Sequence, residues 1–137
     1  MQHIVRIFTL LSLILFLNGC MTMGQEMLKR EPSFSGKGTG QFKVYEKTYD
    51  TTWNAVIEVM KTSKLQLITE NKTSGQILAQ KGMSAFSYGE NVAIFVERQG
   101  SELKTRVEVV SETVMPANTP SENWEKYILK ELDVKLR

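Results

Sequence analysis

The amino-acid sequence predicts an α+β fold: an antiparallel sheet of four to five strands with two helices on one of its faces. Two segments place apolar residues at helical spacing, and several others alternate apolar with polar residues as half-buried strands do. Four of the alternating segments follow one another without a helix between them, and such strands pair antiparallel. The expected order is strand, helix, four strands and helix, β-α-β-β-β-β-α, within a domain of residues 38–137.

The first strand is expected directly after residue 38. One side of this strand carries Phe42 and Val44, and the other carries Lys43, Tyr45 and Lys47. The first helix follows, with Asp50 expected as its N-cap and its end expected near Lys64. Its apolar residues recur at helical spacing: Trp53, Val56, Ile57 and Met60.

Two β-hairpins are expected next. In the first, residues 65–70 alternate, the turn-rich sequence NKTSG follows, and Ile77 and Ala79 alternate with polar neighbours in the returning strand. In the second, one strand has a face made of Val92, Ile94 and Val96. Residues 99–101 supply its turn, and the returning strand is expected to face inward with Leu103, Thr105, Val107 and Val109. This second hairpin is the clearest local signal in the chain.

The last helix is expected to begin at the sequence TPSE and to run to the C-terminus. Thr119 suits the N-cap, Pro120 the first helical position and Glu122 the third, which combines a capping box with a favoured proline. The apolar residues that follow at helical spacing are Trp124, Tyr127, Ile128, Leu129, Leu132 and Leu136. Both tryptophans, Trp53 and Trp124, are expected in the core rather than in a ligand site.

Residues 1–19 have the three-part layout of a secretory signal. A short start carries Arg6, an apolar stretch covers residues 7–17, and small or polar residues precede Cys20. A membrane-spanning helix needs about 20 apolar residues, and this stretch is much shorter. A permanent membrane span is therefore the less favoured interpretation of the segment.

Residues 17–20 read LNGC and resemble the bacterial lipobox, in which leucine lies three positions before an obligatory cysteine and a small residue lies directly before it. Leu17, Gly19 and Cys20 match, whereas Asn18 stands where alanine, serine or threonine is usual. The resemblance implies cleavage between Gly19 and Cys20 and acylation of the Cys20 thiol, and two acyl chains suffice for stable anchoring. Met21 is not the aspartate that retains enterobacterial lipoproteins in the inner membrane, so in a bacterium with two membranes the outer membrane, facing the periplasm, is favoured. Ordinary secretion with a free thiol is the alternative.

Residues 20–37 are expected to hold the acylated Cys20 and to form a flexible tether. They show no sustained period, and GKGTG at 36–40 is typical of a flexible join rather than of a phosphate-binding loop. A tether of this length spans roughly 20 to 25 Å, enough for the domain to stand clear of the lipid. Met21, Met23 and Met27 leave open that the segment lies on the membrane or packs on the domain.

The expected mature chain carries little catalytic chemistry. His3, the one histidine, leaves with the signal and Cys20 is consumed by lipid, which excludes histidine-dependent serine or cysteine catalysis and Cys/His zinc sites. Arg6 leaves as well, so 16 of the 17 basic residues face 15 acidic ones, and this balance argues against nucleic acid as a partner. No cofactor or metal is expected, and the chain is not expected to be an enzyme.

The sequence KTYDTTWNAVIEVMKTSKLQLITENKTSGQILAQ, residues 47–80, resembles the opening of a family of small bacterial lipoproteins of unknown function. The family pattern is matched by Tyr49, Asp50, Trp53, Leu67, Ile68, Ser74, Gly75 and Ile77. The arrangement also looks like the helix-grip domains of BamC, a lipoprotein of the outer-membrane barrel assembly machine. This likeness covers about residues 41–137 and brings no catalytic residues. Within the matched pattern, Gly75 suits a turn position that needs a positive φ.

The hypothesis that follows is a membrane-anchored, non-enzymatic envelope lipoprotein whose periplasmic domain binds or supports another envelope protein. Phe86 and Tyr88, in a loop flanked by glycines, are the candidate contact residues, although the same side chains could fold back onto the sheet. The alternative is binding of a small apolar ligand or lipid between the sheet and the C-terminal helix. A hydrolase built on two carboxylates is a third, less favoured interpretation.

Overall fold

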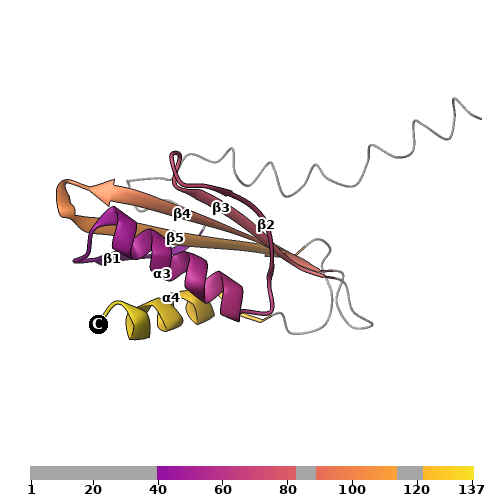
Figure 1. Ribbon diagram of the computed structural model, residues 1–137. Coiled ribbons are helices and arrows are strands. Elements are labelled where there is room, and N and C mark those ends of the chain that lie inside the picture. The colour runs from indigo at the N-terminus through magenta and orange to yellow at the C-terminus, as the bar shows by residue number, and fades with distance from the viewer. Residues whose placement is uncertain (1–39, 83–88, 114–121) are drawn as a thin grey trace, which may run out of the picture.

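A computed structural model describes residues 40–82, 89–113 and 122–137 of this chain. Its elements, in order along the chain, are β1 (Gln41–Tyr45), α3 (Tyr49–Thr62), β2 (Gln66–Asn71), β3 (Gln76–Lys81), β4 (Glu90–Gln99), β5 (Ser101–Thr113) and α4 (Trp124–Lys135) (Figure 1). The predicted α+β class and the order β-α-β-β-β-β-α are confirmed. The sheet has five strands, the upper end of the predicted range.

The five strands form one antiparallel sheet in the order β1-β5-β4-β3-β2. The two hairpins β2–β3 and β4–β5 account for four of these strands, and β3 pairs with β4 between the hairpins. The first strand of the chain pairs with the last, from Gln41 opposite Val109 to Tyr45 opposite Thr105. As a result, β1 and β2 are the two edges of the sheet, although helix α3 alone separates them in sequence.

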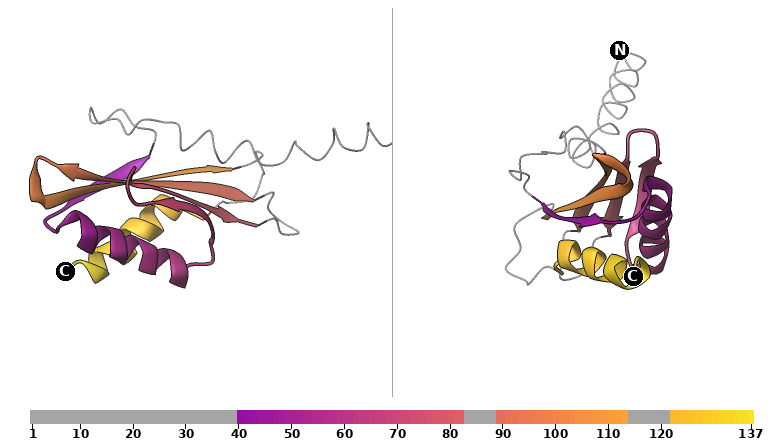
Figure 2. Two further views of the ribbon diagram at one scale, coloured as in Figure 1. Left: turned by 45° about the horizontal axis from the view of Figure 1, so that its top comes forward. Right: turned by 90° about the vertical axis from the view of Figure 1, so that its left-hand side faces the viewer.

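Both helices cover the same face of the sheet, as the side and end views in Figure 2 show. Trp124, Ile128 and Leu132 of α4 are 0 to 1% exposed, as the spacing of four residues predicts. They share one core with alternate strand residues: Ile77, Ala79, Val92, Ile94, Val96, Val107 and Val109. From α3 the core receives Trp53, Val56, Val59 and Met60. Both tryptophans are therefore core residues, as predicted.

Two glycines make the hairpin turns possible. Gly75 in the β2–β3 turn has φ +70° and Gly100 in the β4–β5 turn has φ +72°, a region that L-residues with side chains rarely occupy. The positive φ expected at Gly75 is therefore confirmed. The two sites differ in their surroundings, because a Cβ on Gly75 would lie 2.0 Å from the carbonyl oxygen of Val96, whereas a Cβ on Gly100 would meet no atom within 4 Å beyond its chain neighbours.

The start of helix α3 differs from the sequence prediction. Thr48, rather than Asp50, is the N-cap, and its side-chain oxygen accepts a hydrogen bond of 3.2 Å from the amide of Thr51. Asp50 lies in the first turn, where a negative charge stabilises the helix dipole. The earlier start brings Tyr49 into the helix and its ring onto the core, where it is 7% exposed.

Helix α4 also starts at a different residue. Asn123 is the N-cap, and its side chain accepts a hydrogen bond of 2.9 Å from the amide of Lys126. Glu122 precedes the helix instead of occupying its third position, so the predicted capping box is wrong. Asn123 is as good a capping residue as threonine and lies directly before the apolar run. Thr119 and Pro120 lie outside the described residues.

Two expectations about strand faces also need correction or refinement. In β1, the side that packs against the helices carries Lys43 and Tyr45, while Phe42 and Val44 point to the opposite face. In β5, Leu103 does not face a core, because it is 64% exposed. The β4–β5 hairpin extends beyond the ends of both helices (Figure 2), so neither helix packs against its tip.

Candidate interaction surface

The outer edge of β1 is the candidate functional surface. This strand pairs with β5 on one side, and within the described ranges no strand pairs with its other side. Phe42 is 47% exposed and Val44 is 37% exposed, so two apolar side chains stand beside the unpaired backbone. An edge strand of this kind can pair with an extended segment of another chain.

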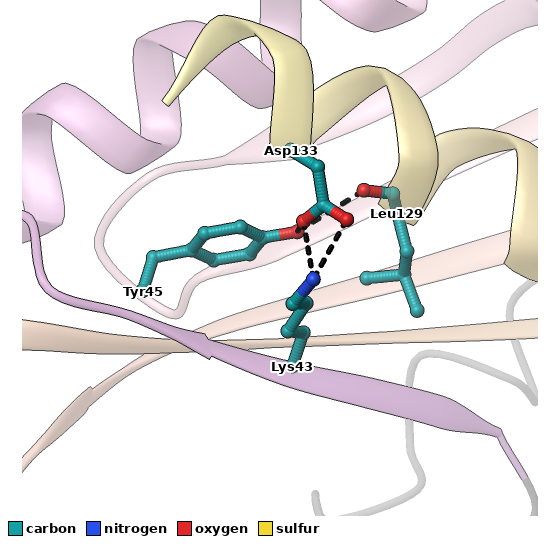
Figure 3. Close-up of polar contacts among 4 residues, drawn as sticks. All are labelled: Lys43, Tyr45, Leu129 and Asp133. Carbon is teal, nitrogen blue, oxygen red and sulfur yellow. Dashed lines mark hydrogen bonds and ion pairs between the residues drawn. The ribbon is translucent and has the colours of Figure 1, made fainter. Parts of the chain in front are cut away.

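A polar cluster fixes β1 to helix α4 (Figure 3). The ammonium group of Lys43 lies 2.7 Å from both carboxylate oxygens of Asp133. The hydroxyl of Tyr45 lies 3.3 Å from the carbonyl oxygen of Leu129 and 3.3 Å from Oδ1 of Asp133. Two successive inward-facing side chains of β1 therefore hold one turn of the helix, and the edge strand has a fixed position.

The electrostatics of this cluster favour a structural role over acid–base chemistry. Burial, together with the charge of Asp133 and the hydrogen bond to it, raises the pKa of Tyr45 far above its usual 10.0. The phenol therefore stays protonated at physiological pH and donates a hydrogen bond. Lys43 is engaged with both carboxylate oxygens, so the cluster offers neither a free base nor a free nucleophile.

The two edges of the sheet differ in regularity. On β2 the pairing register shifts between Leu67 and Thr69, and such bulges make an edge a poor template for further pairing. The register of β1 is continuous from Gln41 to Tyr45, and its single charge, Lys43, is bound by Asp133 on the helix side. The β1 edge therefore lacks the bulge that disrupts its counterpart.

A shallow groove lies on the helical side of the molecule, between α3 and the end of α4. Its volume is about 740 Å³, and it is lined by Thr51, Asn54, Ala55, Ile57, Glu58, Lys61, Lys135 and Leu136. An ion pair of 3.0 Å between Lys135 and Glu58 joins the two helices along it. The groove is open and is lined by polar and apolar side chains alike, unlike the apolar enclosure that a lipid would need.

The space between the sheet and α4, where an apolar ligand was the alternative expectation, is occupied by core side chains. Trp124 is 1% exposed, and its indole nitrogen donates a hydrogen bond to Glu90 on β4. Ile128 and Leu132 are fully buried in the same layer. The described side chains pack here against one another.

The site residues that the sequence singled out lie outside the described residues. Gly19, Cys20, Phe86 and Tyr88 all fall in this group, so lipidation and the aromatic contact loop stay predictions. Sequence reasoning missed Asp133, because its contact with Lys43 joins residues 90 positions apart and leaves no local pattern.

In the described ranges, no three His, Cys, Asp or Glu side chains are grouped as a metal site requires. Neither described helix is long and apolar enough to cross a membrane.

Comparisons with known proteins do not assign a family. No protein-family model matches the chain, and no curated protein does. Among solved structures, the chain is similar to the crystal structure of Ara h 8.0201, at 11% identity over 71% of this chain and 95% of that chain, with a TM-score of 0.35. A score this low does not establish a shared fold. The class of the protein therefore rests on its own structure: an α+β domain with two helices on one face of a five-stranded antiparallel sheet.

Proposed function

We propose that this chain is a lipid-anchored, non-enzymatic binding domain of the bacterial cell envelope, and that the β1 edge holds another envelope protein. The observation that carries the proposal is an exposed, regular edge strand whose position is fixed by the Lys43–Asp133 pair and Tyr45. Anchoring through Cys20 is supported by the LNGC sequence and the apolar stretch before it. The expected location is the outer membrane, facing the periplasm.

Strand addition is the binding mode that suits this edge. An incoming extended segment forms main-chain hydrogen bonds with the free side of β1, and its side chains meet Phe42 and Val44 on one face. The strand has five residues, which is about 17 Å at 3.4 Å per residue. Because β1 is already held by α4, binding does not have to order it, and this lowers the entropic cost of association.

A non-enzymatic role is supported by the chemistry of the described surface. The polar groups that come together at the β1 edge are used in contacts between β1 and α4. The groove beside α3 contains one carboxylate, Glu58, and this group is paired with Lys135. A glycosidase would need two carboxyl groups facing each other across a cleft.

The interaction is tested by photo-crosslinking in intact cell envelopes. A photoreactive amino acid is placed at Val44, on the β1 edge, and as a matched control at Ile68, on the β2 edge. These two β-branched residues are 37% and 38% exposed. The proposal expects an adduct with a protein at Val44 and little adduct at Ile68. Equal adducts at both positions, or adducts with lipid alone, would contradict it.

Probes at Phe86 and Tyr88 test the aromatic loop that the sequence singled out. If this loop belongs to the same interface, probes there give an adduct with the same protein as the probe at Val44. An adduct with a different protein would separate the loop from the β1 edge. Adducts with lipid alone would show that the loop is not part of the binding surface.

The anchor is tested separately. Replacing Cys20→Ala removes the thiol that accepts lipid, so the variant is expected to lose acylation and its attachment to the membrane. Mass spectrometry of the N-terminal peptide and membrane fractionation measure the two effects. A Cys20→Ala chain that is still cleaved and still retained in the membrane would contradict the lipid anchor.

Binding of an apolar ligand between the sheet and α4 has less support. Trp124, Ile128 and Leu132 occupy this space at 0 to 1% exposure, so a ligand would have to displace core side chains. Mass spectrometry of the natively extracted protein tests the idea. A bound lipid that leaves on substitution of Trp124 would favour it over the β1 edge.

A further inference from the structure

The centre of the sheet face that points away from both helices is buried, whereas Phe42 and Val44 at its β1 edge are partly exposed. Its central apolar residues are Leu78 at 3% exposure, Ala93 at 0%, Phe95 at 2% and Val110 at 4%. They belong to three neighbouring strands, and Ala93, Phe95 and Val110 form a core cluster separate from the main one. Both helices lie on the opposite face, so neither of them provides this cover (Figure 2).

Two charged residues on the same face are buried as well. Arg106 is 3% exposed and Glu108 is 2% exposed, and their side chains form an ion pair of 2.7 Å. The guanidinium group also lies 4.3 Å from the centre of the Phe42 ring. Arginine and glutamate on an open sheet face extend into water, and they are almost never this buried unless they are paired. The ion pair accounts for their opposite charges but not for the loss of contact with water, nor for the burial of the apolar residues beside them. A further part of the molecule must therefore lie over this face.

The chain before β1 is the segment best placed to provide the cover. A Cβ on Gly40 would lie 2.7 Å from Cγ2 of Val110 and 2.2 Å from the carbonyl oxygen of Val109. Because the side chain of Val110 points to the buried face, Gly40 packs closely against this residue on that side of the sheet. Gly40, the first described residue, therefore lies directly beside the Val110 cluster.

The composition and length of this segment suit the face. Residues 20–39 contain five large apolar side chains: Met21, Met23, Met27, Leu28 and Phe34. An extended chain covers up to about 3.3 Å per residue, so a few residues before Gly40 already span the width of the three strands. Methionine fits irregular apolar surfaces well, because its side chain is unbranched and flexible.

We propose that residues 20–39 of this same chain dock on the sheet face formed by Leu78, Ala93, Phe95, Val110 and the Arg106–Glu108 pair. The segment then acts as a structural cover rather than as a free tether. If Cys20 carries lipid, as the proposed function holds, docking keeps the domain close to the membrane instead of letting it move at the end of a flexible chain. It also leaves the β1 edge as the open side of the sheet.

The docking is tested by the reactivity of cysteine reporters in the full chain, purified in mild detergent and returned to lipid nanodiscs. The reporter on the covered face is Ala93→Cys, a small change at a fully buried position. Ala79→Cys, on the helix-covered face, is the buried control, and Ser101→Cys, in the exposed hairpin turn, is the open control. Maleimide labelling is located by peptide mass spectrometry, so any reaction at Cys20 is read separately.

The reaction rate of each reporter is compared between the unchanged chain and two chains with altered residues 20–39. In one, the apolar residues Met23, Met27, Leu28 and Phe34 are replaced by serine; in the matched control, the polar residues Gln25, Glu26, Lys29 and Arg30 are replaced instead. The proposal expects Ala93→Cys to react slowly in the unchanged chain and about tenfold or more faster when the apolar residues are removed. The polar replacements leave its rate unchanged, and the Ala79→Cys and Ser101→Cys rates stay constant throughout.

Three results would overturn the proposal. Ala93→Cys that reacts as fast as Ser101→Cys in the unchanged chain would show an open face. Protection that survives removal of the apolar residues would assign the cover to another part of the chain, and protection that depends on protein concentration would assign it to a second copy. If Ala79→Cys also becomes reactive, the domain has unfolded. The unchanged and altered chains are then compared again with Val110→Cys as the reporter and with hydrogen exchange of the β4 amides. Labelling at Cys20 bears on the lipid anchor alone.

Discussion

Replacing the two turn glycines by alanine gives the sharpest test of the packing, because the sites share one backbone conformation and differ in their surroundings. Gly75 has φ +70° and Gly100 has φ +72°. A side chain in this left-handed region costs about 1 to 2 kcal/mol, and the loss of glycine entropy in the unfolded chain returns about 0.4 to 1 kcal/mol. Gly100→Ala is therefore expected to lower the free energy of unfolding by about 1 kcal/mol.

Gly75→Ala adds a collision that Gly100→Ala lacks. The new Cβ would lie 2.0 Å from the carbonyl oxygen of Val96 and 3.3 Å from the hydroxyl of Tyr49. The clashing carbonyl oxygen belongs to the backbone of a central strand, so the β2–β3 turn has to move away from β4. That movement breaks the hydrogen bond of 2.8 Å from the Val96 amide to the Gly75 carbonyl, worth about 0.5 to 1.5 kcal/mol, and disturbs the packing of Tyr49. The expected total loss is about 3 kcal/mol.

Urea unfolding followed by tryptophan fluorescence measures both variants. The slope of the transition should stay the same, so that the shift in midpoint reports stability. Gly82→Ala serves as the neutral control, because no atom lies within 4 Å of its added Cβ. Equal losses for Gly75→Ala and Gly100→Ala would refute the close approach of the turn to Val96.

Three further changes test other parts of the structure. Trp124→Ala removes a side chain that is 1% exposed and should lower the free energy of unfolding by about 3 to 5 kcal/mol, measured by urea denaturation; a loss below 1 kcal/mol would contradict its place in the core. Tyr45→Phe should reduce the fall in the free energy of unfolding at alkaline pH. The pKa of Tyr45 is raised in the folded chain above its usual 10.0, so the contribution of the phenol to this free energy is complete below pH 10.0 and is lost as the pH rises further. An unchanged slope of stability against pH above 10.0 would contradict this. Asp133→Asn should cost only about 0 to 1 kcal/mol, because the pair with Lys43 is partly exposed to solvent, and it should lower the pKa of Tyr45 in an absorbance titration.

The elements of the fold could be predicted from the sequence because each has a local periodic signal. The spacing of Trp124, Ile128 and Leu132 predicted a buried helix face, and all three are buried. The hairpin turn at Gly75 was also visible, since only glycine adopts its φ easily. Such signals depend on residues only a few positions apart, so they can be recognised without knowledge of the tertiary structure.

Details that depend on tertiary contacts could not be predicted in the same way. Alternation in β1 showed two faces but not that the one with Lys43 and Tyr45 packs on the helices, because that choice depends on Asp133, 90 residues from Lys43. The N-caps were misassigned where two capping residues lie near each other in sequence. In α3, the helix starts at Tyr49 after the cap Thr48, and Tyr49 packs on a core whose other residues are distant in sequence.

The candidate surface illustrates the same limit. The periodicity predicted a strand at 41–45, but the pairing of β1 with β5, and so its position at an edge, is a property of the sheet order. The burial of Arg106 and Glu108 could not be predicted from the sequence either, because charged residues at these positions are typical of a sheet face exposed to solvent. Their burial is a property of the folded chain.

The most direct test of the binding role is the crosslinking yield from a probe at Phe42 in three versions of the chain. These are the unchanged chain, Val44→Lys, and the matched Ile68→Lys on the other edge; both replaced residues are more than a third exposed, so neither change should disturb folding. A lysine beside an edge strand opposes the addition of another strand. The account predicts a protein adduct that is strongly reduced by Val44→Lys and unchanged by Ile68→Lys. An adduct that both variants reduce equally, or that neither reduces, would contradict binding at the β1 edge.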